Sequence, residues 1–206
     1  MLSSWPPSHE PDYESTSPDN AASARSALLV LLGSTLAVLA VAGATVPRVP
    51  KGATASEDPL DGLTARHLLI PVKGFPRKAL RDTFDEKRGV RPHEALDIMA
   101  PKGTPVVAAD DGRVAKLFHS ALGGITIYQF DPTEHFTYYY AHLDQYASGL
   151  VEGANVKRGE VIGFVGTTGN APKNAPHLHF TVFRLGPDKR WWTGKAVNSY
   201  AFLNEQ

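Results

Sequence analysis

Hydrophobic and polar positions alternate in short runs through the C-terminal two thirds of the chain. From residue 68 onward, runs rich in β-branched and aromatic residues are separated by Gly, Pro and Asp. The runs cover residues 68–72, 104–109, 113–119, 125–130, 135–143, 160–165 and 177–183. A period of two is typical of half-buried strands, and the spacing favours an antiparallel arrangement. We therefore predict a mainly β domain over residues 67–206, folded as an antiparallel sandwich or barrel.

Two local signals refine this prediction. Asp111-Gly112 stands between two of the runs and predicts a hairpin turn that joins them. The segment Lys78–Arg88 is the one stretch after residue 66 that could form a short helix.

A different pattern occupies residues 27–46, where no charged side chain interrupts the apolar sequence. A helix over this range would span about 30 Å, the hydrocarbon thickness of a bilayer. A buried core helix would show a polar face, and here the polar side chains are only Ser34, Thr35 and Thr45. We predict a membrane-inserted helix, either a transmembrane anchor or a signal-like segment.

The sequence leaves two alternatives open for this segment. The polar stretch before it is long for a signal peptide, which favours an anchor, whereas Ala42-Gly43-Ala44 suits cleavage by a signal peptidase. Arg48 and Lys51 follow the segment and Arg25 precedes it, a bias that mildly favours a cytoplasmic C-terminal side. A long folded domain can override so small a bias, so the sequence leaves the orientation open.

The remaining N-terminal residues are polar and rich in Pro, Ser and Gly. Residues 1–26 predict a disordered tail, and residues 47–66 predict a linker. The expected organisation is therefore a tail, a membrane segment, a linker and one β domain.

Composition narrows the chemistry. Lys plus Arg equals Asp plus Glu at 21 each, so overall charge does not indicate a nucleic-acid partner. The chain has no cysteine, which excludes disulfides, thiolate nucleophiles and Cys-type zinc sites. Any metal site must use His, Asp or Glu, and the chain has eight histidines.

Three histidine motifs are candidates for such a site. In His93-x-x-x-Asp97 the two residues would lie about 13 Å apart on a straight strand, so they share an ion only if the chain curls. In His177-Leu178-His179 both imidazoles would lie on one face of a strand, about 6.6 Å apart. His142 follows a tyrosine run, and a period of two puts it on the same face as Tyr138 and Tyr140. Each motif alone is more often a surface or packing feature.

The order of these motifs carries more information than any one of them. His93–Asp97 runs into Ile98-Met99-Ala100-Pro101-Lys102-Gly103-Thr104-Pro105-Val106, and later come Tyr140-Ala141-His142-Leu143, Gly159-Glu160-Val161-Ile162-Gly163 and His177-Leu178-His179-Phe180. Together they resemble the M23 family of zinc peptidases, which includes lysostaphin and LytM, over about residues 68–202. One departure is Ala95, where the family usually has glycine between the first His and the Asp. Alanine there requires negative φ or costs about 1 kcal/mol of strain.

The resemblance implies roles for individual residues. His93, Asp97 and His179 would be zinc ligands, and His142 and His177 would be the catalytic pair around the metal-bound water. Tyr140, expected on the face of His142, is a candidate oxyanion or substrate donor, with core packing as the alternative. The Gly- and Pro-rich stretch 166–176 would be a loop at the rim of the site.

The resemblance also implies a function. We expect a zinc-dependent endopeptidase that hydrolyses peptide bonds of bacterial peptidoglycan by attack of metal-bound water. One alternative is a non-catalytic member that binds peptidoglycan or activates another hydrolase, and a second is a phosphoryl-accepting carrier domain of similar fold.

The predicted membrane segment suggests where the protein works. We expect a single-pass protein of the cell membrane with its peptidase domain in the periplasm or cell-wall space, or a secreted protein if the segment is cleaved. Peptidoglycan peptides are the expected partners, no nucleic acid is expected, and protein partners are not indicated.

Overall fold

A computed structural model describes residues 61–204, and strands make up most of this region. Its helices are short: α1 (Asp61–Thr64), the 3₁₀ turn η1 (Arg77–Ala79) and α2 (Tyr200–Asn204). The strands are β1 (Lys87–Arg88), β2 (Arg91–Pro92), β3 (Leu96–Met99), β4 (Pro105–Val107), β5 (Gly112–Ser120), β6 (Gly124–Phe130), β7 (Phe136–Tyr146), β8 (Asn155–Val156), β9 (Val161–Val165), β10 (His177–Arg184) and β11 (Lys195–Val197).

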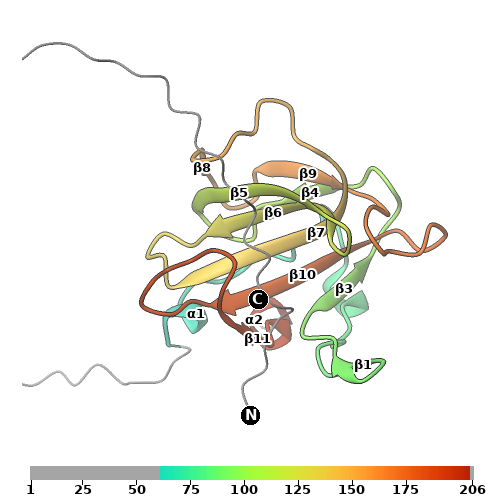
Figure 1. Cartoon of the computed structure of the whole chain (residues 1–206), viewed down its shortest axis with the longest axis horizontal. Helices are drawn as coiled ribbons and strands as arrows, with labels where there is room; N and C mark the ends of the chain where they lie inside the picture. The colour runs from blue at the N-terminus through green and yellow to red at the C-terminus, as the bar shows by residue number, and fades with distance from the viewer. Residues whose placement is uncertain (1–60, 205–206) are drawn as a thin grey trace, which may run out of the picture. The chain divides into compact units, whose positions relative to one another are not determined.

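Nine of these strands form one antiparallel sheet, and β1 and β2 form a separate hairpin. Along the sheet the order is β11-β10-β7-β6-β5-β8, while β3 pairs with the first half of β10. Strand β9 pairs with the end of β7 and also with β4, so these two strands continue the sheet from the far end of β7. Figure 1 shows β3 and the β1 hairpin at one end of β10, away from the middle of the sheet.

The core lies on one face of the long central strands. Tyr138 and Tyr140 of β7 and Leu178, Phe180 and Val182 of β10 are fully buried there. These residues alternate with others along each strand, as a period of two requires. A smaller aromatic cluster covers the opposite face, and its buried members are Tyr128, Tyr139 and Ala141.

The prediction of a mainly β, antiparallel domain is confirmed. Strands occupy six of the seven predicted runs, although some are shorter than the pattern suggested. Residues 68–72 are the exception, because they contribute a single bridge between Val72 and Val106 and no strand. The helix predicted over Lys78–Arg88 is also wrong, since the 3₁₀ turn ends at Ala79 and β1 occupies Lys87–Arg88.

The hairpin predicted at Asp111-Gly112 is wrong as well. β4 pairs with β9, whereas β5 pairs with β6 and β8, so the two runs around this dipeptide do not pair with each other. Gly112 is instead the first residue of β5, where an added Cβ would be 2.0 Å from the backbone oxygen of Phe130. The glycine permits close approach of two strands, which its sequence neighbourhood alone does not distinguish from a turn.

The predictions for residues 1–26, 27–46 and most of the 47–66 linker lie outside the described residues. Within residues 61–204, no helix is long and apolar enough to cross a membrane.

Candidate active site

The first part of the site is a tight curl of the chain between His93 and Asp97. Glu94 has φ of 57°, a left-handed conformation that turns the backbone between the two residues. As a result His93 Nε2 lies 3.0 Å from Asp97 Oδ1, although the same spacing on a straight strand would separate them by about 13 Å. The curl that the motif required is therefore present.

The left-handed residue is Glu94 and not Ala95. The φ of Ala95 is not positive, and its side chain is buried at 1% exposure. The strain considered for an alanine at this position does not arise, because the chain turns one residue earlier. The backbone oxygen of Glu94 also accepts a hydrogen bond from Thr181 Oγ1 at 3.2 Å, which ties the curl to β10.

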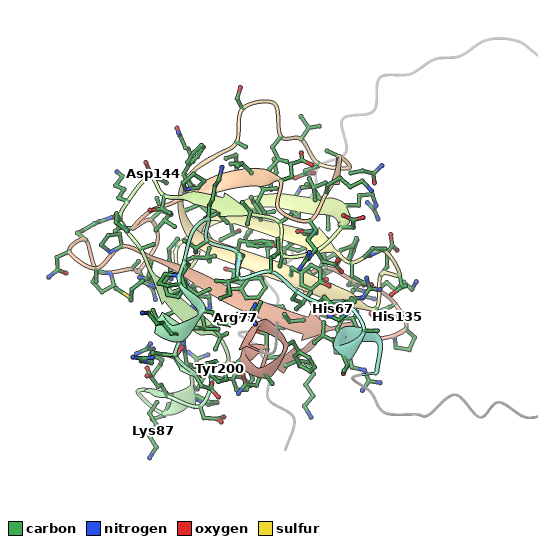
Figure 2. All side chains as sticks on the ribbon, turned by 180° about the vertical axis from the view of Figure 1, so that it is seen from behind. His67, Arg77, Lys87, His135, Asp144 and Tyr200 are labelled. Atoms are coloured by element: carbon green, nitrogen blue, oxygen red, sulfur yellow. The ribbon has the colours of Figure 1, made fainter. Side chains whose placement is uncertain are left out.

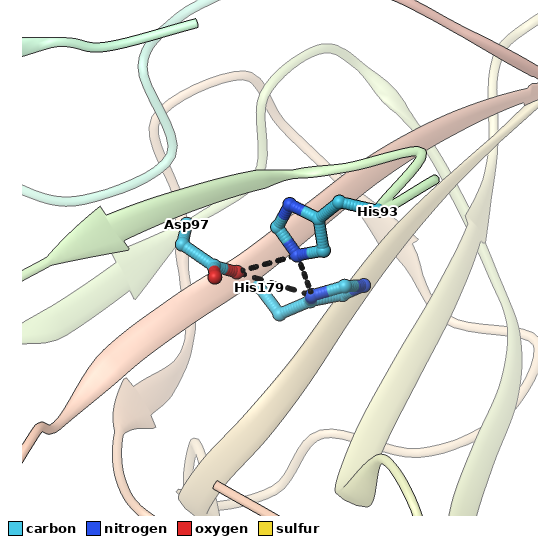
Figure 3. Close-up of side chains that lie close together, drawn as sticks. All are labelled: His93, Asp97 and His179. Carbon is cyan, nitrogen blue, oxygen red and sulfur yellow. Dashed lines mark hydrogen bonds and ion pairs between the residues drawn. The ribbon is translucent and has the colours of Figure 1, made fainter. Parts of the chain in front are cut away.

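Strand pairing supplies the third member of the cluster. β3 pairs with β10 so that Asp97 stands directly opposite His179. His179 Nδ1 lies 3.2 Å from Asp97 Oδ1 and 3.1 Å from His93 Nε2, as Figure 3 shows. Ligand atoms of a tetrahedral zinc ion lie about 3.4 Å apart, close to these separations. The structure thus brings His93, Asp97 and His179 together as a group that could hold a metal ion.

Hydrogen bonding supports a cation at this point. His93 Nδ1 donates to the backbone oxygen of Thr83 at 3.0 Å, so the neutral ring has a bare lone pair on Nε2. That lone pair faces Asp97 Oδ1, itself an acceptor, across 3.0 Å. Two acceptors at this distance are favourable only with a cation or a proton between them. The donor set, two imidazoles and one carboxylate, is one that zinc accepts.

The second part of the site depends on an irregularity in β7. Ile127 pairs with Tyr140 and Ile125 pairs with Leu143, so β7 carries one extra residue over this stretch. His142, within this bulge, has φ of 60°. A bulge changes the side to which the following side chains point. His142 therefore joins His177 and His179, with ring centroids 4.9 and 5.5 Å away.

The bulge overturns the expectation that Tyr140 and His142 share a face. Tyr140 points into the core, where its hydroxyl donates to Gln129 Oε1 at 2.7 Å and accepts from the Ala109 N–H at 3.0 Å. With both bonds made and the side chain fully buried, Tyr140 is not brought to the site. The residue that lies beside the cluster is Tyr139, whose ring makes an edge contact with His179 at 6.1 Å.

His142 and His177 are oriented alike. The Nδ1 of His142 donates to the backbone oxygen of Thr168 at 2.9 Å, and the Nδ1 of His177 donates to that of Ala175 at 2.8 Å. In each neutral ring Nε2 is then the free lone pair. His177 Nε2 lies 3.7 Å from Asp97 Oδ1, so it faces the proposed metal position.

Burial sets the charge of the site. It lowers the pKa of His142 to about 4, with the nearby His179 acting in the same direction. It also lowers the pKa of His179, against the effect of Asp97. Burial opposes ionisation of Asp97, but the neighbouring side chains of His179 and His93 outweigh it and hold the pKa of Asp97 well below its usual range. At neutral pH these groups are two uncharged imidazoles and a carboxylate, the forms that bind a metal or accept a proton.

Sequence reasoning missed the residues that support this site. Besides orienting His93, Thr83 uses its hydroxyl to bond the Ala95 oxygen and the Asp97 N–H, at 3.1 and 3.0 Å. Thr168 lies in the loop that was expected at the rim of the site, and its carbonyl orients His142. Two of these contacts use backbone carbonyls, which any residue supplies, so no motif could have identified them.

Comparison with known proteins agrees with the fold and with the family resemblance of the sequence. The family model for peptidase family M23 matches residues 91–199, a range that includes all five residues of the candidate site. The chain therefore belongs to this family of metallopeptidases, and the resemblance found in its sequence is confirmed.

Individual relatives show how much of each protein is shared. The chain is 36% identical to an L-Ala–D-Glu endopeptidase of Bacillus subtilis over 54% of its own length and 36% of that protein. It is 33% identical to the peptidoglycan DD-endopeptidase ShyC of Vibrio cholerae over 54% of its length and 27% of that protein. Among solved structures, LytM from Ruminococcus gnavus is 32% identical with a TM-score of 0.53, and the match covers 61% of this chain and 53% of that one. The chain thus spans about a third of these curated relatives.

Proposed function

We propose that the protein is a zinc-dependent endopeptidase that hydrolyses peptide bonds in bacterial peptidoglycan. The observation that carries the proposal is the convergence of His93 Nε2, Asp97 Oδ1 and His179 Nδ1 within about 3 Å of one another, beside two further histidines. Such a gathering of ionisable side chains is more typical of a reactive site than of a packing feature.

Three residues would hold the ion, through His93 Nε2, Asp97 Oδ1 and His179 Nδ1. When bound, a zinc ion supplies a Lewis acid that activates water and polarises the scissile carbonyl. Three protein ligands leave a fourth position open, as catalytic zinc sites do. The cluster is also open on one side, since the Asp97 and His179 side chains are 16% and 19% exposed.

His142 and His177 would accept and donate the protons that the reaction transfers. Each has its Nδ1 hydrogen committed to a backbone carbonyl, so Nε2 is the atom that takes a proton from the attacking water. The low pKa of His142 keeps that nitrogen unprotonated at neutral pH. The protonated ring then stabilises the oxyanion and donates to the leaving amine.

The substrate class comes from the relatives. One relative is named an L-Ala–D-Glu endopeptidase and another a peptidoglycan DD-endopeptidase. The two names specify two different kinds of peptide bond. We propose peptidoglycan peptides as the substrate and leave the bond to the experiment.

The test is digestion of purified peptidoglycan by the zinc-loaded protein, followed by mass spectrometry of the released fragments. We expect soluble muropeptides with a new amino terminus at one kind of bond, and we expect their release to stop with a chelator and to return when zinc is added. An Asp97→Ala variant prepared in parallel controls for contaminating hydrolases. If zinc-loaded protein binds peptidoglycan but releases no fragment, it is a non-catalytic binding member.

We further propose that residues 27–46 insert into the cell membrane and that the linker presents the peptidase domain to the periplasm or cell wall. The uncharged apolar sequence supports this proposal. Fractionation of cells expressing the chain tests it, because an anchored protein stays with the membrane pellet after a high-salt wash. Recovery of the intact domain in the medium would indicate cleavage instead.

A further inference from the structure

A positively charged side chain outside the five-residue group touches the metal site. Arg88 Nη2 lies 2.7 Å from Asp97 Oδ2, a charge-assisted contact, and 3.3 Å from Glu86 Oε2. Arg88 itself is 50% exposed, whereas the Asp97 side chain is 16% exposed. The guanidinium therefore reaches inward from the surface to a carboxylate at the centre of the site.

The two oxygens of Asp97 consequently have different partners. Oδ1 faces His93 and His179 at 3.0 and 3.2 Å, and Oδ2 faces Arg88. A carboxylate binds a metal through one oxygen or through both. While Oδ2 is paired with Arg88, Oδ1 is the oxygen presented to the ion.

The backbone holds Arg88 in this place. It lies on β1, which pairs with β2 so that Arg88 stands opposite Arg91 and Lys87 opposite Pro92. The base of the hairpin is tied by the His93 N–H to the Glu86 oxygen and by the Glu94 N–H to the Phe84 oxygen, both at 2.8 Å. The hairpin is therefore continuous with the backbone segment that carries His93, the first candidate ligand. Figure 2 shows Lys87 at the far end of this projection, pointing away from the domain.

We propose that Arg88 is a positioning residue that occupies Asp97 Oδ2 and restricts this ligand to one oxygen. The inference deepens the proposed zinc peptidase function and rests on it. Its physical consequence is an open fourth position: a carboxylate that turned both oxygens to the ion would fill part of the space that the reaction needs. Arg88 also brings a positive charge close to the ion, so it lowers metal affinity while it preserves reactivity.

The proposal predicts an unusual combination of effects for Arg88→Ala. We expect kcat on peptidoglycan peptides to fall about 10- to 100-fold with little change in KM. We expect metal affinity to stay the same or rise, because a positive charge is removed and the second oxygen becomes available. A merely structural contact would give the opposite result for the metal, since a loosened ligand binds less tightly.

The experiment measures the metal directly on the full chain. The protein is loaded with Co²⁺ in place of zinc, and the visible absorption is recorded, which is intense for four-coordinate cobalt and weaker at higher coordination number. The affinity for zinc is measured by competition with a chromophoric chelator. The variants are Arg88→Ala and Arg88→Lys, and Arg91→Ala is the matched control because it removes the same charge from the neighbouring strand of the hairpin.

The expected result is a weaker cobalt absorption and unchanged or tighter zinc binding in Arg88→Ala only, with partial recovery of kcat and absorption in Arg88→Lys. Three results would overturn the proposal: an unchanged cobalt spectrum with unchanged kcat, zinc binding weakened together with thermal stability, or a raised KM with an unchanged spectrum. The last result would assign Arg88 to substrate binding.

The outcome is separable from the proposed function. If the wild-type protein binds metal but releases no peptidoglycan fragment, the peptidase proposal fails, while the cobalt and zinc measurements on the variants still decide the role of Arg88.

Discussion

Three histidines of the site share one arrangement: each donates its Nδ1 hydrogen to a backbone carbonyl. The acceptors are the oxygens of Thr83 for His93, Thr168 for His142 and Ala175 for His177. A backbone carbonyl only accepts, so each bond selects one tautomer and directs a bare Nε2 into the site. The chemical difference among them is then one of position: His93 lies beside Asp97 Oδ1, whereas His142 lies against the rings of His177 and His179.

This difference predicts a separation of roles between two alanine variants. His179→Ala removes a nitrogen of the ligand group, so the purified protein should lose most of its zinc. His142→Ala leaves all three ligand atoms in place, so it should keep its zinc and lose turnover by about 100-fold or more. Zinc content by atomic absorption and fragment release measure the two effects. Wild-type hydrolysis by His142→Ala would remove His142 from the mechanism.

The same burial predicts how stability depends on pH in the metal-stripped protein. The pKa of His142 falls from 6.5 to about 4 on folding because burial disfavours the charged ring. Between these values the unfolded chain binds a proton that the folded chain does not, so the free energy of unfolding falls as pH drops from about 7 to 4. The pKa of His179 is also lowered on folding, so this residue acts in the same direction.

Denaturant titrations at pH 7 and pH 5 measure this slope. His142→Gln should flatten it, and the control His119→Gln, which changes an exposed histidine, should not. An equal slope in His142→Gln and the wild-type protein would mean that His142 does not carry the effect.

At the scale of elements, the bulge of β7 and the loop at residues 166–176 act together to place His142. Thr168 Oγ1 accepts from the Ile125 N–H at 2.9 Å and donates to the Leu143 oxygen at 2.6 Å, so the loop is fastened across β6 and β7. Its carbonyl then meets His142. Gly169 follows with φ of 68°, and a Cβ there would lie 2.2 Å from the Leu122 oxygen. The loop approaches the β5–β6 turn as closely as only glycine permits.

Gly169→Ala should therefore push the loop away from this turn and displace the carbonyl that orients His142. We expect kcat to fall by about 10-fold or more with zinc content unchanged, because the three ligands lie on other elements. Gly149→Ala is the matched control: it has φ of 78° but no atom within 4 Å of an added Cβ. Equal losses in the two variants would attribute the effect to backbone strain, at about 1 kcal/mol, and not to the collision.

At the scale of the whole molecule, a buried ion network of residues outside the candidate site joins three segments of the chain. Arg66 contacts Asp110 at 3.0 Å and Asp131 at 2.6 Å, with 14%, 10% and 0% of the side chains exposed. Tyr138 of β7 donates its hydroxyl to Asp110 at 3.0 Å. The network fastens the segment after α1 to the ends of β4 and β6. Within the described residues this charged group shares no member with the candidate metal site, and we expect it to act on stability alone.

Arg66→Met tests this distinction. It leaves two buried carboxylates without their cation, which should lower the free energy of unfolding by about 3–5 kcal/mol. Arg113→Met is the control, because its pair with Glu134 is 42% and 36% exposed and should contribute less than about 1 kcal/mol. Denaturant titration gives both values. Zinc affinity should be unchanged in both variants, and a loss in Arg66→Met would show that the two centres are coupled.

Much of the fold could be predicted because the residue types that favour a strand can be recognised within one short segment of sequence. The runs of β-branched and aromatic residues at 113–119, 125–130 and 177–183 correspond to β5, β6 and β10, because such residues favour a strand whichever segment it pairs with. Pairing itself depends on distant segments, and for that reason the hairpin at Asp111-Gly112 was wrong while the strands beside it were right.

By itself the sequence determined the antiparallel β class, the chemistry available without cysteine, and, through the order of its motifs, the M23 family. Only the tertiary structure decided which side chains meet. The left-handed turn at Glu94 closes His93 onto Asp97, the bulge in β7 takes His142 away from the face of Tyr140, and the hairpin brings Arg88 to Asp97 Oδ2. A shift of strand register by one residue, or one residue with positive φ, reverses the direction in which a side chain points. Such a change is stabilised by contacts with distant parts of the chain.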